Sequence, residues 1–272
     1  MTDLIVLGSG GAFSDKFGNT QFYVDTKNPK TSLLIDCGCT WLENARTVGP
    51  DKFKKEWVHN IFITHLHDDH SAGLGTLALM HYFYPHFPKK PKLFVHRSIA
   101  SQVWPKLAAG LETLADHQLP DGKKRCQIDD YFDLQVINDN DCFHLGDICY
   151  RPIQSMHVVH GAEFMSSYGL EMTLKDSRRV VITGDTQFAP DQLRSRVNGA
   201  KLVFHDCETG YFPDGKPMRS GVHAHLHDIK EVISDNVQEK IAICHYGDNF
   251  VPEMLEGSKL RAVTRGDIIE LD

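Results

Sequence analysis

The run from Thr64 to Leu74 constrains this chain more than any other part of its sequence. It reads Thr-His-Leu-His-Asp-Asp-His-Ser-Ala-Gly-Leu and directly follows a short apolar stretch, Ile61 to Ile63. Three imidazoles and a carboxylate within six residues cannot all face one way on a strand or a helix, so a loop must gather them. Such density is typical of metal binding, and imidazole with carboxylate suits zinc, iron or manganese.

Three later segments have the same form, an apolar run followed by a residue that can bind a metal. Ile148 to Ser155 precedes His157 and His160, Val180 to Thr183 precedes Asp185, and Ile241 to Cys244 precedes His245. Short apolar runs that end in His or Asp are typical of strands that carry functional side chains at their ends. The repetition of this arrangement supports a metal site.

The remaining apolar runs predict further strands, separated by a few helices. Strands are predicted at Leu4 to Leu7, Gln21 to Asp25, Ser32 to Ile35, Leu93 to Val95, Leu170 to Leu174, Leu202 to Phe204 and Ile268 to Leu271; helices are predicted at Leu74 to Tyr84, Ile99 to Ala115 with an interruption near Pro105, and Leu226 to Val237. Strands with occasional helices predict an α/β fold of two packed sheets with helices outside. We expect one domain over residues 1–272.

Gly8-Ser9-Gly10-Gly11 predicts a tight turn, since Phe13 leaves the dinucleotide-binding pattern incomplete.

Composition excludes several classes of protein. A formal charge of −7 argues against a broad grip on duplex nucleic acid, which needs many phosphates to be neutralised, but it permits a compact phosphate site with metal ions. No apolar run approaches the roughly 18 residues that cross a bilayer, and no signal peptide opens the chain. Seven cysteines without regular spacing favour reduced thiols. We therefore expect a cytoplasmic protein with no membrane partner and no duplex nucleic acid partner.

With these motifs in place, the sequence resembles the metallo-β-lactamase superfamily, whose hallmark is His-x-His-x-Asp-His followed by a His, an Asp and a His. The resemblance extends from about Leu4 to His245 and implies a four-layer αββα sandwich. It implies two zinc ions, with manganese or iron as alternatives: one held by His65, His67 and His157, a second held by Asp69, His70 and His245, and Asp185 bridging both. His160 follows the same strand as His157, so it is either the alternative ligand or a substrate contact.

Smaller motifs resemble the ribonuclease Z group of phosphodiesterases within this superfamily. They are Leu7-Gly8-Ser9-Gly10-Gly11, Leu34-Ile35-Asp36-Cys37-Gly38, Tyr168-Gly169, Phe204-His205-Asp206-Cys207 and Val222-His223-Ala224-His225. The resemblance implies that Asp206 orients His223 as the general acid and that Asp69 also belongs to the catalytic set. His225 is the alternative acid and, with His160, a candidate substrate contact. The competing interpretation is that the histidines near Leu226 cap a helix.

One departure from ribonuclease Z bears on the substrate. That group inserts a long, basic, Gly-rich arm for transfer RNA between the third His and the bridging Asp, whereas His157 and Asp185 are only 28 positions apart here. The chain is in this respect similar to compact cyclic-nucleotide phosphodiesterases of the same fold, including those by which phages degrade host defence signals.

The predicted function is therefore that of a metallohydrolase, a phosphodiesterase acting on a small nucleotide phosphodiester. The expected reaction converts a 3′,5′-cyclic nucleotide to a 5′-nucleotide, with a hydroxide shared by two zinc ions as nucleophile and His223 with Asp206 as acid. One alternative is an RNA 3′-processing endonuclease of ribonuclease Z type, and another is a non-catalytic metal-binding scaffold or sensor. The resemblance also implies a homodimer.

Overall fold

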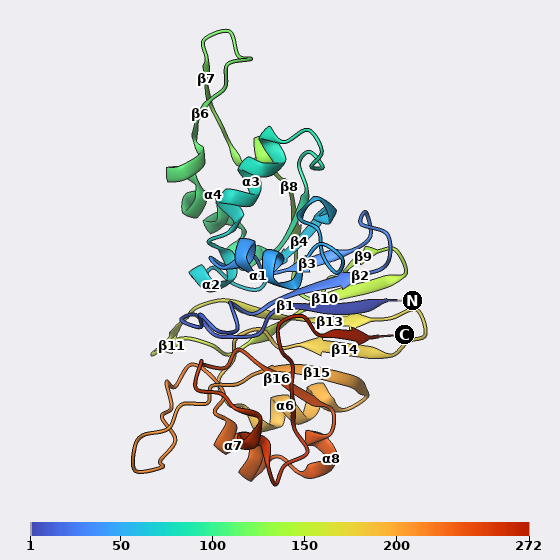
Figure 1. Ribbon diagram of the computed structural model, residues 1–272, viewed down its shortest axis with the longest axis vertical. Helices are drawn as coiled ribbons and strands as arrows, with labels where there is room; N and C mark the ends of the chain where they lie inside the picture. Colours follow the sequence, from blue (N-terminus) through green and yellow to red (C-terminus); the bar gives the residue numbers. More distant parts are fainter. Residues whose placement is uncertain (1, 272) are drawn as a thin grey trace.

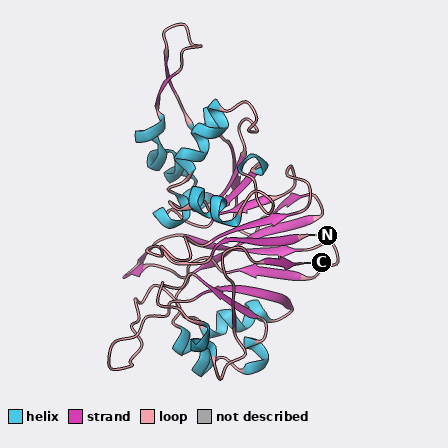
Figure 2. Cartoon of the chain, viewed as in Figure 1, coloured by secondary structure: helices cyan, strands magenta, loops and turns pink. Residues whose placement is uncertain are grey.

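Two seven-stranded sheets stack face to face, and helices cover both outer faces (Figures 1 and 2). The structure is a computed structural model that describes residues 2–271. This arrangement is the four-layer αββα sandwich that the resemblance implied. None of the helices in the described part of the chain is long and apolar enough to span a membrane.

The first sheet has the strand order β18-β1-β2-β3-β4-β5-β8. Its strands are β1 (Asp3–Gly8), β2 (Gln21–Asp25), β3 (Leu33–Ile35), β4 (Asn60–Ile63), β5 (Lys92–His96), β8 (Asp133–Ile137) and β18 (Ile268–Glu270); its helices are α1 (Trp41–Val48), α2 (Asp68–Ser71), α3 (Leu74–Phe83), α4 (Arg97–Leu111) and α5 (Ile128–Tyr131), with a 3-10 turn η1 (Lys55–Trp57). Strands β3, β4, β5 and β8 run parallel. Their carboxyl ends therefore meet at one edge.

The second sheet has the order β17-β16-β15-β14-β13-β10-β9. Its strands are β9 (Phe143–Leu145), β10 (Ile148–Ser155), β13 (Ser167–Thr173), β14 (Arg179–Ile182), β15 (Ala200–Asp206), β16 (Ile241–Cys244) and β17 (Arg261–Ala262); its helices are α6 (Pro190–Val197), α7 (Leu226–Val232) and α8 (Asp235–Gln238), with a 3-10 turn η2 (Pro252–Leu255). Strands β14 to β17 run parallel. The second sheet thus resembles the first in its run of four parallel strands.

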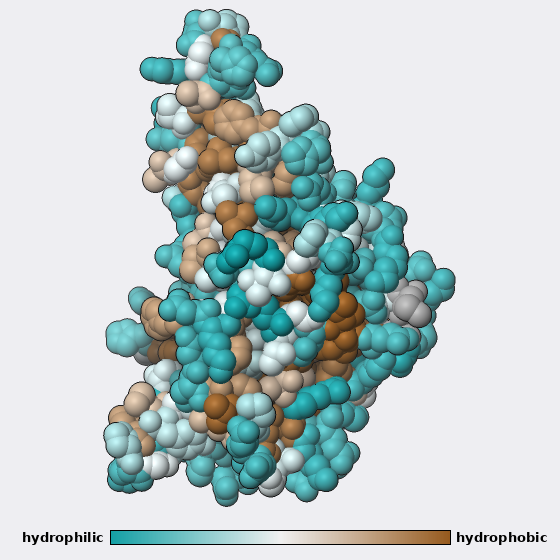
Figure 3. All heavy atoms as spheres, viewed as in Figure 1, coloured by the Kyte–Doolittle hydropathy of each residue, from teal (hydrophilic) through white to brown (hydrophobic). Residues whose placement is uncertain are grey.

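Two short hairpins lie outside the main sheets. The hairpin of β6 (Thr113–Ala115) and β7 (Lys123–Arg125) projects from the top of the molecule in Figure 1, and Figure 3 shows mainly hydrophilic residues at its tip. The hairpin of β11 (Val159–His160) and β12 (Glu163–Phe164) follows the end of β10. This second hairpin therefore lies close to the predicted metal ligand His157.

Strand β1 shows how a nearly continuous apolar run serves two cores. Leu4 and Val6 pack between the two sheets, whereas Ile5 and Leu7 pack against the helices of the first layer. Successive side chains of a strand point to opposite faces, so a strand covered on both sides must be apolar at nearly every position.

The predicted strands all overlap observed ones, but two helix predictions need correction. The helix predicted over Ile99 to Ala115 ends at Leu111, and Thr113–Ala115 form β6 instead. Pro105 does not interrupt α4, because it lies on the exposed side while buried residues continue on either side of it. The helix predicted over Leu226 to Val237 is divided into α7 and α8, because Ile233 and Ser234 are extended.

Candidate metal and catalytic site

The predicted ligands follow the carboxyl ends of strands in both sheets and meet at one end of the sandwich. His65 and His67 follow β4, Asp69 and His70 lie on α2, His157 follows β10, Asp185 follows β14, and His245 follows β16. The structure brings all seven residues into two neighbouring groups.

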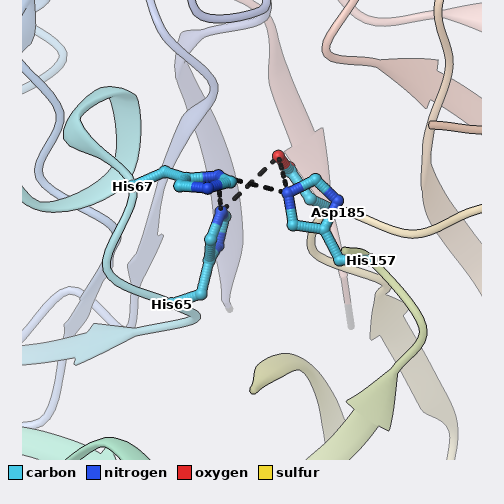
Figure 4. A group of neighbouring side chains, drawn as sticks. All are labelled: His65, His67, His157 and Asp185. Atoms are coloured by element: carbon cyan, nitrogen blue, oxygen red, sulfur yellow. Dashed lines mark hydrogen bonds and ion pairs between the residues drawn. The ribbon is translucent and has the colours of Figure 1, made fainter. Parts of the chain in front are cut away.

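The first ligand group consists of His65, His67, His157 and Asp185, whose ligand atoms lie within 4.8 Å of one another. Figure 4 shows the four side chains pointing toward a common centre. Nδ1 of His67 lies 3.0 Å from Nε2 of His65 and 3.1 Å from Nε2 of His157. Oδ2 of Asp185 lies 3.6 Å and 3.7 Å from the same two Nε2 atoms.

The second ligand group consists of Asp69, His70, His245 and Asp185, which are all buried. Nε2 of His70 lies 3.2 Å from a carboxylate oxygen of Asp69 and 3.2 Å from one of Asp185. Nε2 of His245 lies 3.2 Å from Asp69 and 3.4 Å from Asp185. Asp185 therefore belongs to both groups, which is the position that the resemblance implied for a bridging ligand.

The chemistry of these groups fits a pair of divalent cations. Burial by itself raises the pKa of Asp185, but His245, His70 and His65 hold it well below its ordinary range, so the carboxylate is ionised. Nε2 of His70 is buried and has no hydrogen-bond partner among residues 2–271, although it faces two carboxylates. A cation between these atoms would satisfy them, and a donor set of only imidazole and carboxylate suits zinc, manganese or iron.

Hydrogen bonds on the far side of the rings of His65, His70 and His157 orient these three histidines. Nδ1 of His70 donates to Asp36 at 2.7 Å, and Nδ1 of His157 donates to the Val222 carbonyl at 2.9 Å. Nδ1 of His65 lies 3.0 Å from the Thr64 hydroxyl. Such partners fix the tautomer of a metal-binding imidazole and aim its other nitrogen at the metal.

Asp36 contacts the candidate site, although the sequence prediction gave it no role. It is buried, and besides His70 it accepts hydrogen bonds from the backbone N–H and the hydroxyl of Thr64 at 2.8 and 2.9 Å. Gly38 follows it where a Cβ would come within 1.9 Å of the Asp69 carbonyl oxygen. The Asp-Cys-Gly motif thus packs directly against the metal loop. An acidic residue immediately after a buried strand was the available signal.

The predicted acid pair is also assembled. Nδ1 of His223 donates to Oδ2 of Asp206 at 2.8 Å, and the same oxygen accepts from the backbone N–H of Thr186. Burial lowers the pKa of His223, but the charge and the hydrogen bond of Asp206 outweigh it and raise that pKa. Oδ1 of Asp206 lies 3.3 Å from Nδ1 of His245, so one carboxylate contacts both His223 and a candidate ligand.

The two predicted substrate contacts lie apart from the ligand groups. His225 is the N-cap of α7: its Nδ1 accepts from the backbone N–H of His227, and its Nε2 donates to the Gly210 carbonyl. Both ring nitrogens are therefore engaged, which favours the capping interpretation. His160 is exposed on β11, and the structure brings His157 rather than His160 to the other ligands. A substrate contact by His160 or His225 stays a prediction.

A cavity of about 650 Å³ opens onto the site. His67, Asp69, His157, Asp185 and His223 line it, together with Ala12, Phe13, Cys39, Leu66, Asp68 and Val222. Phe13 is 98% exposed, although it is a large apolar side chain beside a polar site. Its loop follows the predicted Gly-rich turn, in which Gly11 packs against His245. The turn thus contacts the site through Gly11, and the loop after it presents Phe13 to the cavity.

Sequence comparisons find relatives that match nearly the whole chain. The chain matches the sequence model of a family described as "Anti-Pycsar protein Apyc1" over residues 2–269. It is 29% identical to a protein of that name from Bacillus phage vB_BsuM-Goe3 over 274 residues, which covers 97% of this chain and 96% of the relative.

Two solved structures show the same fold. The metallo-β-lactamase fold protein YhfI from Bacillus subtilis superposes with a TM-score of 0.69 at 16% identity, covering 99% of this chain and 100% of that one. Zn²⁺-bound PqqB from Methylobacterium extorquens gives a TM-score of 0.68 at 13% identity, with 99% and 100% covered. The fold predicted from the sequence motifs is confirmed.

Proposed function

The chain belongs to the anti-Pycsar protein Apyc1 family, and from this premise we propose that it is a metal-dependent phosphodiesterase that converts a 3′,5′-cyclic nucleotide to a 5′-nucleotide. The observation that carries the proposal is the position of Asp185, which joins the two ligand groups. Neighbouring cation sites with a common carboxylate are an arrangement that stabilises in-line displacement at phosphorus.

The ligand groups supply the first part of the mechanism. His65, His67 and His157 would hold one cation, Asp69, His70 and His245 the other, and Asp185 both. Two such cations lower the pKa of a shared water and offset the charge on the phosphate oxygens. The hydrogen bonds that orient the rings keep the ligand atoms in place before substrate binds, so little reorganisation is needed during the reaction.

His223 and Asp206 supply the proton for the leaving oxygen. Because Nδ1 of His223 is committed to Asp206, the other ring nitrogen is free to face substrate in the cavity that His223 lines. The charge and the hydrogen bond of Asp206 raise the pKa of His223 and favour its protonated form, which is the form needed when the P–O3′ bond breaks. The proton then passes to the 3′-oxygen, and Asp206 stabilises the charged ring before this transfer and holds its orientation throughout.

Several features favour a small substrate over RNA. The cavity of about 650 Å³ is of the size that holds small ligands, and Phe13 offers an aromatic face on which a base can stack. The segment between His157 and Asp185 consists of the short β11–β12 hairpin with β13 and β14, and it contains no long basic arm. A non-catalytic scaffold would have no need of the oriented His223–Asp206 pair.

Zinc is the working metal in this proposal. It is supported by a donor set made only of imidazole nitrogens and carboxylate oxygens, and by the Zn²⁺-bound protein of the same fold. Two zinc ions per chain follow from the two ligand groups. The homodimer, the cytoplasmic location and the absence of a duplex nucleic acid partner stay predictions of the sequence.

A side-by-side assay tests the proposal. The zinc-loaded chain is incubated with cyclic mononucleotides, with a short single-stranded RNA and with an aryl phosphodiester, and products are separated by chromatography. We expect 5′-nucleotides from the cyclic substrates and no RNA cleavage. RNA cleavage without cyclic-nucleotide hydrolysis would support the ribonuclease Z alternative, and failure to hydrolyse any diester would support the scaffold.

A further inference from the structure

A second cluster of metal-binding side chains lies on the β9–β10 hairpin. In this hairpin His144 is paired directly with Cys149 across the two strands. Phe143, Leu145, Ile148 and Tyr150 are buried in the core between the sheets. Because side chains alternate along a strand, His144 and Cys149 point to the opposite face, and Cys142, two residues before His144, points there too.

The three side chains are close enough to share one ion. Sγ of Cys142, a ring nitrogen of His144 and Sγ of Cys149 all lie within 4.8 Å of one another. In a tetrahedral zinc site, bond lengths to sulfur and nitrogen place the ligand atoms about 3.5–3.8 Å apart. The three side chains are half-buried or exposed, so small rotations would bring their ligand atoms from within 4.8 Å to the spacing of a zinc site.

We propose that Cys142, His144 and Cys149 bind a soft divalent cation of the Zn²⁺ type at a site separate from the candidate catalytic centre. Binding would release the two thiol protons to solvent and form two thiolate bonds and one imidazole bond, with water as the fourth ligand. Thiolate with imidazole selects zinc-like cations over magnesium or calcium, which prefer oxygen. The ligand groups of the candidate catalytic site contain no sulfur, so the two sites differ in chemistry.

The position of the cluster gives it a structural role. Cys149 lies near the start of β10 and His157 follows its end, so about 20 Å of extended strand separates the two sites. In Figure 1, β9 lies at the side of the sandwich that carries the chain termini, opposite β11 and α2. The cation would fasten the outer face of a hairpin whose strand β9 is only three residues long and lies at the sheet edge.

The inner face of the same hairpin contributes to packing between the sheets. Phe143 stacks on Phe94 of β5 with ring centroids 4.1 Å apart and on Tyr150 with centroids 5.1 Å apart. A cation on the outer face would hold β9 against β10 and so keep Phe143 in this stack. Loss of the cation should therefore lower thermal stability without changing hydrolysis.

Cobalt titration of the full chain in the presence of a phosphine reductant tests the site, because thiolate ligands give cobalt a charge-transfer absorption that nitrogen and oxygen ligands do not. We expect this absorption to saturate at one thiolate-bound cobalt per chain. It should disappear in the Cys142→Ser/Cys149→Ser variant, and this variant should keep phosphodiesterase activity within about twofold of the parent. Changing exposed His144 to Ala should weaken cobalt binding at least about tenfold.

Cys39→Ser is the matched control, since Cys39 is the cysteine that lines the catalytic cavity. The signal should persist in this variant, and circular dichroism should show that every variant is folded. Absence of the absorption in the reduced parent chain at saturating cobalt would overturn the proposal. Persistence of the absorption in the folded double-serine variant would overturn it as well, as would a disulfide between the two cysteines with no cobalt bound after its reduction.

Discussion

The two candidate ligand groups differ in what orients their imidazole rings. In the first group, a hydroxyl of Thr64 and the carbonyl of Val222 contact the rings of His65 and His157. In the second group, the carboxylates of Asp36 and Asp206 contact the rings of His70 and His245. A charged acceptor makes the opposite nitrogen of an imidazole a stronger donor to a metal.

Burial adds to this difference. All members of the second group are buried, whereas His67 of the first group is half-exposed. The cavity is lined by His67 and His157 of the first group and by Asp69 of the second. The second group should therefore hold its cation more tightly, and the first should exchange its cation more readily beside the substrate. The comparison predicts a centre that combines a firmly held cation with a more accessible one, with Asp185 as a ligand of both.

The largest expected effect comes from removing the residue common to both groups. Asp185→Ala should lower kcat/KM for a cyclic nucleotide at least about a thousandfold, equivalent to about 4 kcal/mol, because both ligand groups lose a carboxylate. The measurement is hydrolysis at saturating zinc with metal content determined on the same sample. Asp191→Ala, an exposed carboxylate on α6, is the control. Full activity in Asp185→Ala would show that the groups do not act together.

The next effect concerns His223, the proposed general acid. It is linked to the second ligand group by Asp206, which contacts both His223 and His245. His223→Ala should slow cyclic-nucleotide hydrolysis about a hundredfold or more, since its alkoxide leaving group needs a proton. An aryl phosphodiester has a better leaving group, so its rate should fall only a few-fold, and metal content should be unchanged. Equal losses on both substrates would mean that His223 does not act as the acid.

Asp36→Asn acts on the second group directly, through His70, and on the first group only through the Thr64 hydroxyl that contacts His65. Asn keeps the shape of the side chain and tolerates the positive φ of 63° at this position, but it removes the charge beside His70. Zinc affinity should fall about ten- to a hundredfold at one of the two positions, as measured by competition with a chromogenic chelator. If both positions weaken equally, or neither does, the asymmetry between the groups is contradicted.

The smallest effect involves a residue that contacts neither group. Phe13→Ala should raise KM for a cyclic nucleotide about tenfold with little change in kcat, because stacking on a base is lost while the ligands stay in place. Steady-state kinetics checks this, and Phe13→Tyr should restore the low KM. An unchanged KM in Phe13→Ala would place the base elsewhere in the cavity.

Much of the fold was predictable from sequence because its central strands are covered on both faces. Runs such as Ile61 to Ile63 and Val180 to Ile182 are apolar throughout, and their ligands follow within a few residues. Strand β8 was missed because Asp133 and Gln135 break its apolar run, and β9 because three residues give no periodic signal.

Interactions that depend on tertiary structure could not be predicted in the same way. Asp36 contacts the ring of His70, which lies 34 positions later in the chain. The parallel pairing of β3 with β4 brings these two residues together. Both ring nitrogens of His225 are hydrogen-bonded because the fold brings the Gly210 carbonyl and the His227 backbone N–H to the start of α7. The grouping of Cys142, His144 and Cys149 likewise depends on hairpin register, which irregular cysteine spacing did not reveal.

Zinc titration of the metal-free chain, with cyclic-nucleotide hydrolysis followed at each step, tests the central claim most directly. The Cys142→Ser/Cys149→Ser background keeps any ion on the β9–β10 hairpin out of the count. Activity should remain low up to one zinc per chain and rise to its maximum at two, with a 5′-nucleotide as product. Full activity at one zinc, or no hydrolysis with two bound, would contradict a phosphodiesterase whose two metal positions share Asp185.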